Sequence, residues 1–176
     1  MSFDFFYIMS ELKKVPRKGW IEKAGINKPE SVADHSYGTA IMAMLFSDMK
    51  NLDTENMIKM ALIHDLAESI IGDFTPNEIS KESKKVVENE AMKDILSKLP
   101  LNISEQYMKI WKEFQECKTE ESILLHDIDR LEMAMQAAKY FSEGYSKEKL
   151  QEFIESARKE IKSKEILKIL DMISYK

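Results

Sequence analysis

Apolar residues recur every three or four positions along most of this chain, and no stretch alternates apolar and polar residues as a half-buried strand would. Only five glycines and four prolines interrupt the pattern in 176 residues. The pattern predicts an all-α fold, with one domain over residues 1–176, because no repeat or linker divides it. Helices are expected over residues 3–14, 31–50, 54–68, 79–98, 104–117, 119–142, 146–160 and 163–174.

Two glycine- and proline-containing segments separate the first predicted helices. Residues 16–29 read as an ordered loop, and residues 72–76 read as a second one. Ser31 offers an N-cap with Asp34 three residues later, so a helix is expected to begin there. Both loops adjoin the ionisable residues described next, and loops over a rigid scaffold often carry substrate-binding groups.

The helix predicted after Thr54 carries ionisable residues on the stripe that should face the core. Ala61, His64, Asp65 and Glu68 stand at offsets 0, 3, 4 and 7, which places them on one side of a helix. Burying unpaired charges is costly, so such a cluster needs a strong partner, most simply a metal ion. The spacing therefore indicates a metal site.

Further ligands are expected from two other helices. His35 follows the capped helix start, and an acidic residue must come from Asp127 or Asp129. These two aspartates flank the expected core stripe on opposite sides, so periodicity does not choose between them, and His126-Asp127 forms a second histidine–aspartate pair. The expected core stripe of this helix consists of Leu124, Ile128, Leu131, Met135 and Ala138.

Charge and cysteine content narrow the class of protein. The net charge of −5 and the lack of a dominant basic segment argue against a nucleic-acid-binding face. The densest basic stretch, Lys81, Lys84 and Lys85, is interspersed with Glu82, Glu88 and Glu90 and is interpreted as a solvated helix face. The single cysteine, Cys117, fits a reducing compartment and predicts a cytoplasmic protein.

The N-terminal segment indicates whether the protein is expected to associate with a membrane or with a partner chain. The apolar run from Phe5 to Met9 is too short for a membrane span, and Asp4 opposes a signal peptide, so no membrane association is expected. The aromatic residues around 3–9 suggest a partner helix, which makes a homodimer the expected assembly.

The sequence resembles the HD-domain phosphohydrolases, and within them the 5′-deoxynucleotidase family. The resemblance rests on residues 12–20 (LKKVPRKGW), 29–36 (PESVADHS), 61–68 (ALIHDLAE), 71–73 (IGD) and 128–132 (IDRLE). It implies a single HD-domain helical bundle in which His35, His64, Asp65 and Asp129 bind one divalent metal ion. Nitrogen and oxygen donors without a thiolate suit Mn²⁺, Co²⁺, Fe²⁺, Ni²⁺ or Mg²⁺. His126 departs from the lysine usual in the family and is expected, at most, to support a metal ligand without binding the metal itself.

The resemblance also implies roles around the ion. Glu68 would manage protons and Arg17 would bind phosphate, whereas without the resemblance Glu68 could equally orient a ligand and Arg17 could be a surface residue. Asp73 would accept a hydrogen bond from the sugar or act as a turn residue, and Trp20 would pack on the sugar or belong to the core. Lys18 and Thr75 complete the expected substrate contacts.

The expected activity is metal-dependent hydrolysis of deoxyribonucleoside 5′-monophosphates to deoxynucleoside and phosphate. Alternatives are a phosphohydrolase acting on ribonucleotides or cyclic nucleotides, and a non-catalytic binding protein that holds a structural metal. A dinuclear oxygenase or phosphodiesterase is disfavoured because His126 is the only other histidine.

Overall fold

The computed structural model describes residues 3–75 and 77–173, and within them every regular element is helical, which confirms the all-α prediction. The helices are α1 (Phe3–Glu11), α2 (Val32–Lys50), α3 (Thr54–Ile63), α4 (Glu68–Ile71), α5 (Lys81–Leu96), α6 (Leu101–Glu116), α7 (Glu120–Ser142), α8 (Lys147–Glu160) and α9 (Lys164–Met172). None of these described helices combines the length and apolar character that a membrane crossing requires.

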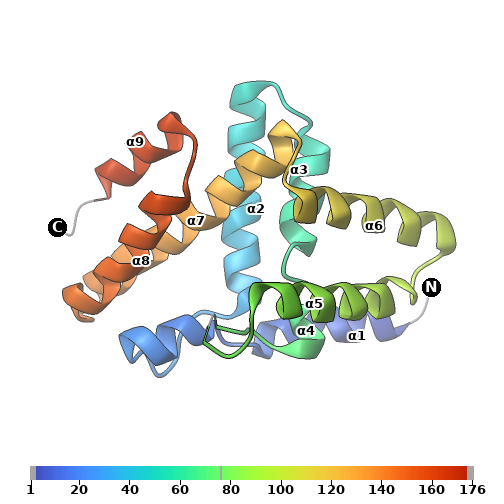
Figure 1. Cartoon of the computed structure of the whole chain (residues 1–176), viewed down its shortest axis with the longest axis horizontal. Coiled ribbons are helices and arrows are strands. Elements are labelled where there is room, and N and C mark those ends of the chain that lie inside the picture. The colour runs from blue at the N-terminus through green and yellow to red at the C-terminus, as the bar shows by residue number, and fades with distance from the viewer. Residues whose placement is uncertain (1–2, 76, 174–176) are drawn as a thin grey trace.

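Helix α2 lies at the centre of the bundle and is crossed by α7 (Figure 1). Helix α3 packs along one side of α2, and α8 packs along α7, so the two long helices join the halves of the molecule. Large side chains from these helices form a continuous buried core. Its fully buried members include Met57, Met60, Leu125, Ile128 and Leu150.

The predicted cap of α2 is confirmed. The backbone N–H of Asp34 donates to Ser31 Oγ at 3.1 Å, and the Ser31 N–H donates in return to the Asp34 carboxylate at 2.9 Å. This reciprocal pair satisfies two backbone donors at the helix start. It fixes the point at which the chain enters α2, four residues before His35.

The predicted continuous helix over 54–68 is wrong. Helix α3 ends at Ile63, a turn covers residues 64–67, and the short α4 begins at Glu68. Through this turn the backbone bonds are of the i to i+3 type, as from Leu66 N–H to Ile63 O at 3.1 Å and from Glu68 N–H to Asp65 O at 3.0 Å. A segment with such bonds has about three residues per turn, so residues i and i+3 lie directly above one another. The offsets of 0, 3, 4 and 7, which assume 3.6 residues per turn, therefore do not describe residues 64–67.

The expected core stripe of α7 is partly wrong. Leu124, Ile128 and Leu131 are buried, whereas Met135 is 43% exposed and Ala138 is only half-buried. The inward face continues instead through Ala134 and Ala137, both fully buried. Small residues at these positions suit the close packing of α7 against α2 and α8.

The loop expected over residues 16–29 is ordered and contains a short π-helix, Trp20–Ala24, which the sequence reading missed. Its two ends are tied together, because Arg17 N–H donates to Glu30 O at 3.1 Å and Val32 N–H donates to Val15 O at 2.9 Å. Arg17 is therefore held on a closed loop next to the start of α2.

Candidate functional site

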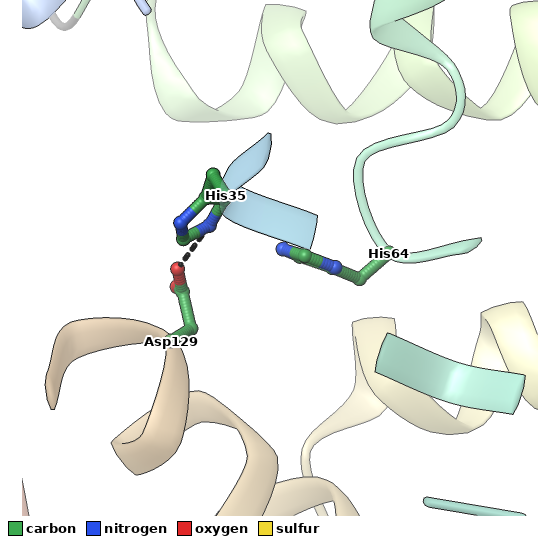
Figure 2. Close-up of side chains that lie close together, drawn as sticks. All are labelled: His35, His64 and Asp129. Atoms are coloured by element: carbon green, nitrogen blue, oxygen red, sulfur yellow. Dashed lines mark ion pairs between the residues drawn. The ribbon is translucent and has the colours of Figure 1, made fainter. Parts of the chain in front are cut away.

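Two histidines from different elements face one another in the centre of the molecule. His35 from α2 and His64 from the turn after α3 have ring centroids 5.4 Å apart, and Asp129 from α7 faces His35 (Figure 2). Nε2 of His35 lies 3.0 Å from Asp129 Oδ1. Ligand atoms of these three residues all lie within 4.8 Å of one another.

Asp65 lies beside the two histidines of this group. Its Oδ2 lies 3.2 Å from His64 Nε2 and 3.8 Å from His35 Nε2. The four residues predicted to bind a metal thus come together from α2, the turn after α3, and α7. Three of the four are buried, and Asp65 is half-buried.

A contact at Nδ1 orients each histidine ring so that Nε2 faces the centre of the site. Nδ1 of His35 lies 2.5 Å from Glu132 Oε2, and Nδ1 of His64 lies 2.6 Å from the carbonyl oxygen of Ala61. A neutral imidazole that donates through Nδ1 presents an electron pair at Nε2. Both Nε2 atoms are buried and have no partner with hydrogen-bond geometry. Two orphaned nitrogens that face two carboxylates are what a bound cation would satisfy, so these residues fit a divalent metal ion.

The electrostatics of the site favour positive charge. Burial lowers the pKa of His35, but the carboxylates of Asp129 and Glu132 outweigh burial and raise it to about 10. Burial raises the pKa of Asp65, but His64, His35 and Arg17 outweigh it and hold that pKa well below its usual range. The pocket between the carboxylates thus stabilises a cation, which a metal ion would provide in place of a proton.

Glu30 stands beside Glu132, behind His35. The two carboxylates and His35 offer ligand atoms within 4.8 Å of one another. We interpret this group as support for the histidine, because the 2.5 Å separation of Glu132 Oε2 and Nδ1 is that of a hydrogen bond. Burial and the neighbouring Glu132 raise the pKa of Glu30 to about 7.

The structure distinguishes the two candidate aspartates of α7. Asp129 faces the histidines, whereas Asp127 accepts backbone hydrogen bonds from Lys162 at 2.9 Å and Ser163 at 2.7 Å. Asp127 therefore fixes the loop before α9. His126 stacks on Phe114 with centroids 4.2 Å apart, and Phe114 in turn contacts the edge of His64 at 5.5 Å. His126 thus packs behind the site and is separated from it by Phe114.

Glu68 is 1% exposed and lies next to a lysine that the sequence reading placed in solvent. Its Oε1 is 3.1 Å from Lys84 Nζ, and its Oε2 is buried without a partner. Burial and the charge of Asp65 raise the pKa of Glu68 well above its usual range, although Lys84 opposes this shift. The interpretation of Lys84 as part of a solvated face is therefore wrong.

A cavity of about 350 Å³ opens beside these residues. Arg17 lines it, with a largely buried side chain whose Nη1 lies 3.8 Å from Asp65 Oδ2. Four further cationic residues contribute to the wall, Lys23, Lys81, Lys84 and Arg130, together with three acidic ones, Asp73, Glu152 and Glu160. The cationic residues outnumber the acidic ones, so the lining differs from the net charge of −5 of the chain and suits an anionic ligand.

The loop after α4 closes one side of the cavity. Asp73 and Thr75 are buried and line the cavity. The backbone N–H of Lys18 donates to Asp73 Oδ2 at 2.8 Å, and the N–H of Thr75 donates to Glu78 at 2.9 Å. Gly72 precedes them with a φ of 77°, a conformation that favours glycine.

Two other residues expected to touch substrate, Lys18 and Trp20, have partners within the protein. Lys18 Nζ pairs with Glu78 at 2.8 Å and is not among the residues that line the cavity, so its substrate contact stays a prediction. Trp20 lines the cavity but is 1% exposed, stacks on Phe153 at 4.0 Å and donates through Nε1 to Glu30. The structure thus supports the core interpretation of Trp20.

Sequence reasoning missed Lys84, Glu132 and Glu30. For Lys84 a signal was present, because Lys84, Glu88, Ala91 and Ile95 follow helical spacing and Ala91 and Ile95 are core residues. This spacing places Lys84 on the inward face of α5. The role of Glu132 depends on how α7 crosses α2, and no local pattern reveals that crossing.

Comparison with known proteins agrees with this geometry. Residues 9–169 match the HD domain family, and the site defines an HD-domain protein. The chain is 40% identical over 166 residues to 5′-deoxynucleotidase HDDC2 of Dictyostelium discoideum, covering 88% of this chain and 87% of the relative. It is 35% identical over 167 residues to human 5′-deoxynucleotidase HDDC2, covering 94% and 81% of the two chains.

A solved structure shares the fold. The crystal structure of PH0347 protein from Pyrococcus horikoshii OT3 superposes with a TM-score of 0.80 at 31% identity and covers 98% of both chains. The chain therefore belongs to the 5′-deoxynucleotidase HDDC2 family of HD-domain phosphohydrolases.

Proposed function

We propose that this protein is a metal-dependent 5′-deoxynucleotidase, which hydrolyses deoxyribonucleoside 5′-monophosphates to deoxynucleoside and phosphate. The observation that carries the proposal is the pair of buried Nε2 atoms of His35 and His64, which make no hydrogen bond and face the carboxylates of Asp129 and Asp65. A cavity in whose lining cationic residues outnumber acidic ones lies beside them. The names of the HDDC2 relatives support the substrate class. The cavity volume lies near the lower end of the range for small-molecule sites, which suits a mononucleotide.

His35, His64, Asp65 and Asp129 would hold one divalent ion. When bound, such an ion neutralises phosphoryl oxygens and lowers the pKa of bound water. The donor set of two imidazoles and two carboxylates suits Mn²⁺, Co²⁺, Fe²⁺, Ni²⁺ or Mg²⁺. One ion per chain is proposed because the third histidine, His126, packs against Phe114 away from the other two.

Arg17 would bind the phosphate. Its guanidinium group is permanently charged and presents a planar set of donors that matches phosphate oxygens. Asp65 and the closed loop from residue 16 to residue 31 hold it at the cavity wall. Charge that develops on the phosphoryl oxygens would be stabilised by this fixed cation.

Glu68 would supply the proton for the leaving group. Burial and the charge of Asp65 raise the pKa of Glu68 well above its usual range, which favours a proton on the carboxyl group, and its Oε2 has no hydrogen-bond partner. The bond between phosphorus and the 5′ oxygen breaks with its electron pair on that oxygen, which takes the proton of Glu68. The attacking water forms the new P–O bond, and the proton it releases restores the carboxyl group.

The remaining cavity residues would select the sugar. Asp73 is held by the Lys18 N–H with its carboxylate at the wall, where it would accept a hydrogen bond from a sugar hydroxyl. Thr75 lies on the same loop and would contact the same part of the nucleotide. A sugar lacking the 2′ hydroxyl would then be distinguished by its fit against this loop.

We also propose a homodimer in the cytoplasm. Helix α1 buries none of its residues, and Phe3, Phe6 and Tyr7 are exposed on it. A second apolar surface runs along α2 at helical spacing and consists of Tyr37, Ile41, Met44, Leu45 and Met49, all exposed. Exposed apolar stripes of this kind are typical of interfaces. Sedimentation equilibrium of the wild type and of Ile41→Glu tests the assembly, and a monomeric wild type would contradict it.

The test of function is phosphate release from dAMP, AMP and cyclic AMP with and without added Mn²⁺ or Co²⁺. We expect metal-dependent release from dAMP, weaker release from AMP and none from cyclic AMP. Glu68→Gln should reduce kcat for dAMP by about 10²-fold or more, while the exposed control Glu82→Gln should not change it. Full activity of Glu68→Gln with metal bound would contradict the assignment of Glu68.

A further inference from the structure

Arginine side chains from two different segments approach the two aspartates of the proposed metal site. Nη1 of Arg17 lies 3.8 Å from Asp65 Oδ2, and Nη1 of Arg130 lies 3.7 Å from Asp129 Oδ2. Both aspartates lie near Nε2 of His35, Asp129 at 3.0 Å and Asp65 at 3.8 Å. Both arginines also line the same cavity. The two guanidinium groups therefore reach the proposed metal ligands from separate segments, the loop before α2 and helix α7.

Arg130 has an ion pair that holds one side of its guanidinium group. Its Nε lies 2.8 Å from Oε2 of Glu160, the last residue of α8, and the arginine is half-buried. One carboxylate can engage at most two of the five N–H donors of a guanidinium group. The 3.7 Å between Nη1 and Asp129 Oδ2 is longer than a hydrogen bond, so this contact is electrostatic only. Arg130 thus keeps donors for a further acceptor in the cavity.

The charges around these donors favour an anion as that acceptor. Asp65 and Asp129 would face the proposed metal ion and would then compensate the charge of the arginines less. Two permanent cations at the wall of one cavity repel one another, and an anion that contacts both relieves this repulsion. A phosphate group has several acceptor oxygens, and the planar donor set of a guanidinium group matches two of them.

We propose that Arg130 is a second phosphate-binding residue, which donates to the phosphoryl group of the substrate from α7 as Arg17 does from the loop before α2. This inference rests on the proposed function and adds a substrate-binding residue to the same site. Glu160 holds Nε, so the terminal nitrogens Nη1 and Nη2 supply the donors for phosphate.

Binding of inorganic phosphate to the Mn²⁺-loaded protein, measured by isothermal titration, tests this assignment without relying on catalysis. Arg130→Gln should weaken phosphate binding about 10- to 100-fold, as expected for lost hydrogen bonds to a charged group. The matched control is Arg158→Gln, because Arg158 is exposed on α8, pairs with Asp171 and is not among the residues that line the cavity. This control should bind phosphate within twofold of the wild type. Unchanged phosphate binding in Arg130→Gln would overturn the proposal.

Two other roles for Arg130 would give different results, and either result would overturn the proposal. If Arg130 only held Asp129 in place, Arg130→Gln would weaken Mn²⁺ binding and leave the phosphate affinity of the metal-loaded protein unchanged. If Arg130 only braced α8, Glu160→Gln would weaken phosphate binding as much as Arg130→Gln does. We expect Glu160→Gln to bind phosphate at least as tightly as the wild type. It removes a negative charge from the wall, and its amide oxygen can still accept from Nε.

A conservative variant tests the geometry of the contact. Arg130→Lys keeps the positive charge but loses the planar set of donors. It should recover only part of the phosphate affinity that Arg130→Gln loses. Phosphate binding by Arg130→Lys that is as weak as that of Arg130→Gln would overturn the proposal, because the charge at this position would then contribute nothing.

Hydrolysis of dAMP distinguishes failure of this inference from failure of the proposed function. Arg130→Gln should lower kcat/KM for dAMP at least tenfold. If the wild type hydrolyses dAMP and Arg130→Gln binds phosphate normally, the assignment of Arg130 is overturned and the proposed activity stands. If Arg130→Gln loses phosphate binding and the wild type hydrolyses no deoxynucleotide, the assignment of Arg130 stands and the proposed activity is overturned.

Discussion

Nδ1 of His35 and Oε2 of Glu132 lie 2.5 Å apart, so a carboxylate from α7 determines how a histidine from α2 faces the centre of the site. Glycine at position 38 makes room for this contact, because a Cβ atom there would lie 2.7 Å from Glu132 Oε1. The orientation of His35 therefore depends on two residues that do not themselves face the proposed ion.

This relationship predicts the effect of changes at both positions. Glu132→Ala should weaken Mn²⁺ binding about 10- to 100-fold, because the ring loses the acceptor that orients it. Glu132→Gln should weaken binding less, since its amide oxygen can still accept from Nδ1. Gly38→Ala should displace Glu132 and weaken binding in the same direction. Isothermal titration with Mn²⁺ measures these changes, and wild-type affinity in Glu132→Ala would contradict the orienting role.

The two aspartates of α7 should respond oppositely to substitution. Asp129→Asn should abolish tight Mn²⁺ binding because it removes a charged group that faces His35. Asp127→Asn should bind Mn²⁺ normally but lose about 1–3 kcal/mol of stability, because two backbone donors lose a charged acceptor. Chemical denaturation and Mn²⁺ titration of both variants test this pair. Loss of Mn²⁺ binding in Asp127→Asn would contradict the assignment.

Glu30 predicts a pH dependence of stability in the metal-free protein. Its pKa is about 7 in the folded state and close to 4.5 in the unfolded chain. Between these values the folded protein holds more protons, so the contribution of Glu30 to the free energy of unfolding decreases as the pH rises from 4.5 to 7. After allowance for partial exposure, this decrease should amount to about 1–3 kcal/mol.

The comparison with Glu30→Gln isolates this effect from the titration of the histidines. The glutamine can still accept from Trp20 Nε1 but does not ionise. The stability difference between wild type and variant, measured by urea denaturation in EDTA, should move in favour of the variant as the pH rises from 5 to 8. A constant difference over this range would contradict the raised pKa of Glu30.

Removal of the metal should destabilise the folded protein. The proposed ion satisfies both orphaned Nε2 atoms and the facing carboxylates, so it binds the folded chain in preference to the unfolded one. At a free Mn²⁺ concentration of 100 Kd the gain in stability is about 2.7 kcal/mol. Thermal unfolding in EDTA and after addition of Mn²⁺ tests this, and His64→Ala should show no such shift.

The fold class could be predicted from the sequence because it depends on local signals, whereas the predicted ligand set, and the choice of Asp129 in particular, came from the resemblance to a family. Period-3.6 apolar spacing specifies helices, and the capping pair Ser31 and Asp34 marks the start of α2. The turn at residues 64–67 could not be predicted, because the same apolar spacing continues through it and only the i to i+3 bonds reveal the break. The helical offsets placed His64, Asp65 and Glu68 together on the assumption of a continuous helix. In the structure a turn, and not a continuous helix, brings these residues together.

The residues that position the site could not be identified from local sequence patterns. Asp127 and Asp129 are equivalent by periodicity, and only the position of the loop before α9 shows that Asp127 binds its backbone. Glu30, Glu132 and Lys84 act across pairs of elements that are distant in the chain. Their roles depend on how α2, α5 and α7 cross, which is a property of the whole bundle.

The central claim is that one divalent ion is shared by three separate segments of the chain. Anomalous diffraction from a crystal grown with Mn²⁺ tests it most directly. We predict a single peak per chain, bonded to Nε2 of His35 and of His64 and to the carboxylates of Asp65 and Asp129. A peak elsewhere, two adjacent peaks, or no peak between these residues at saturating Mn²⁺ would contradict the account.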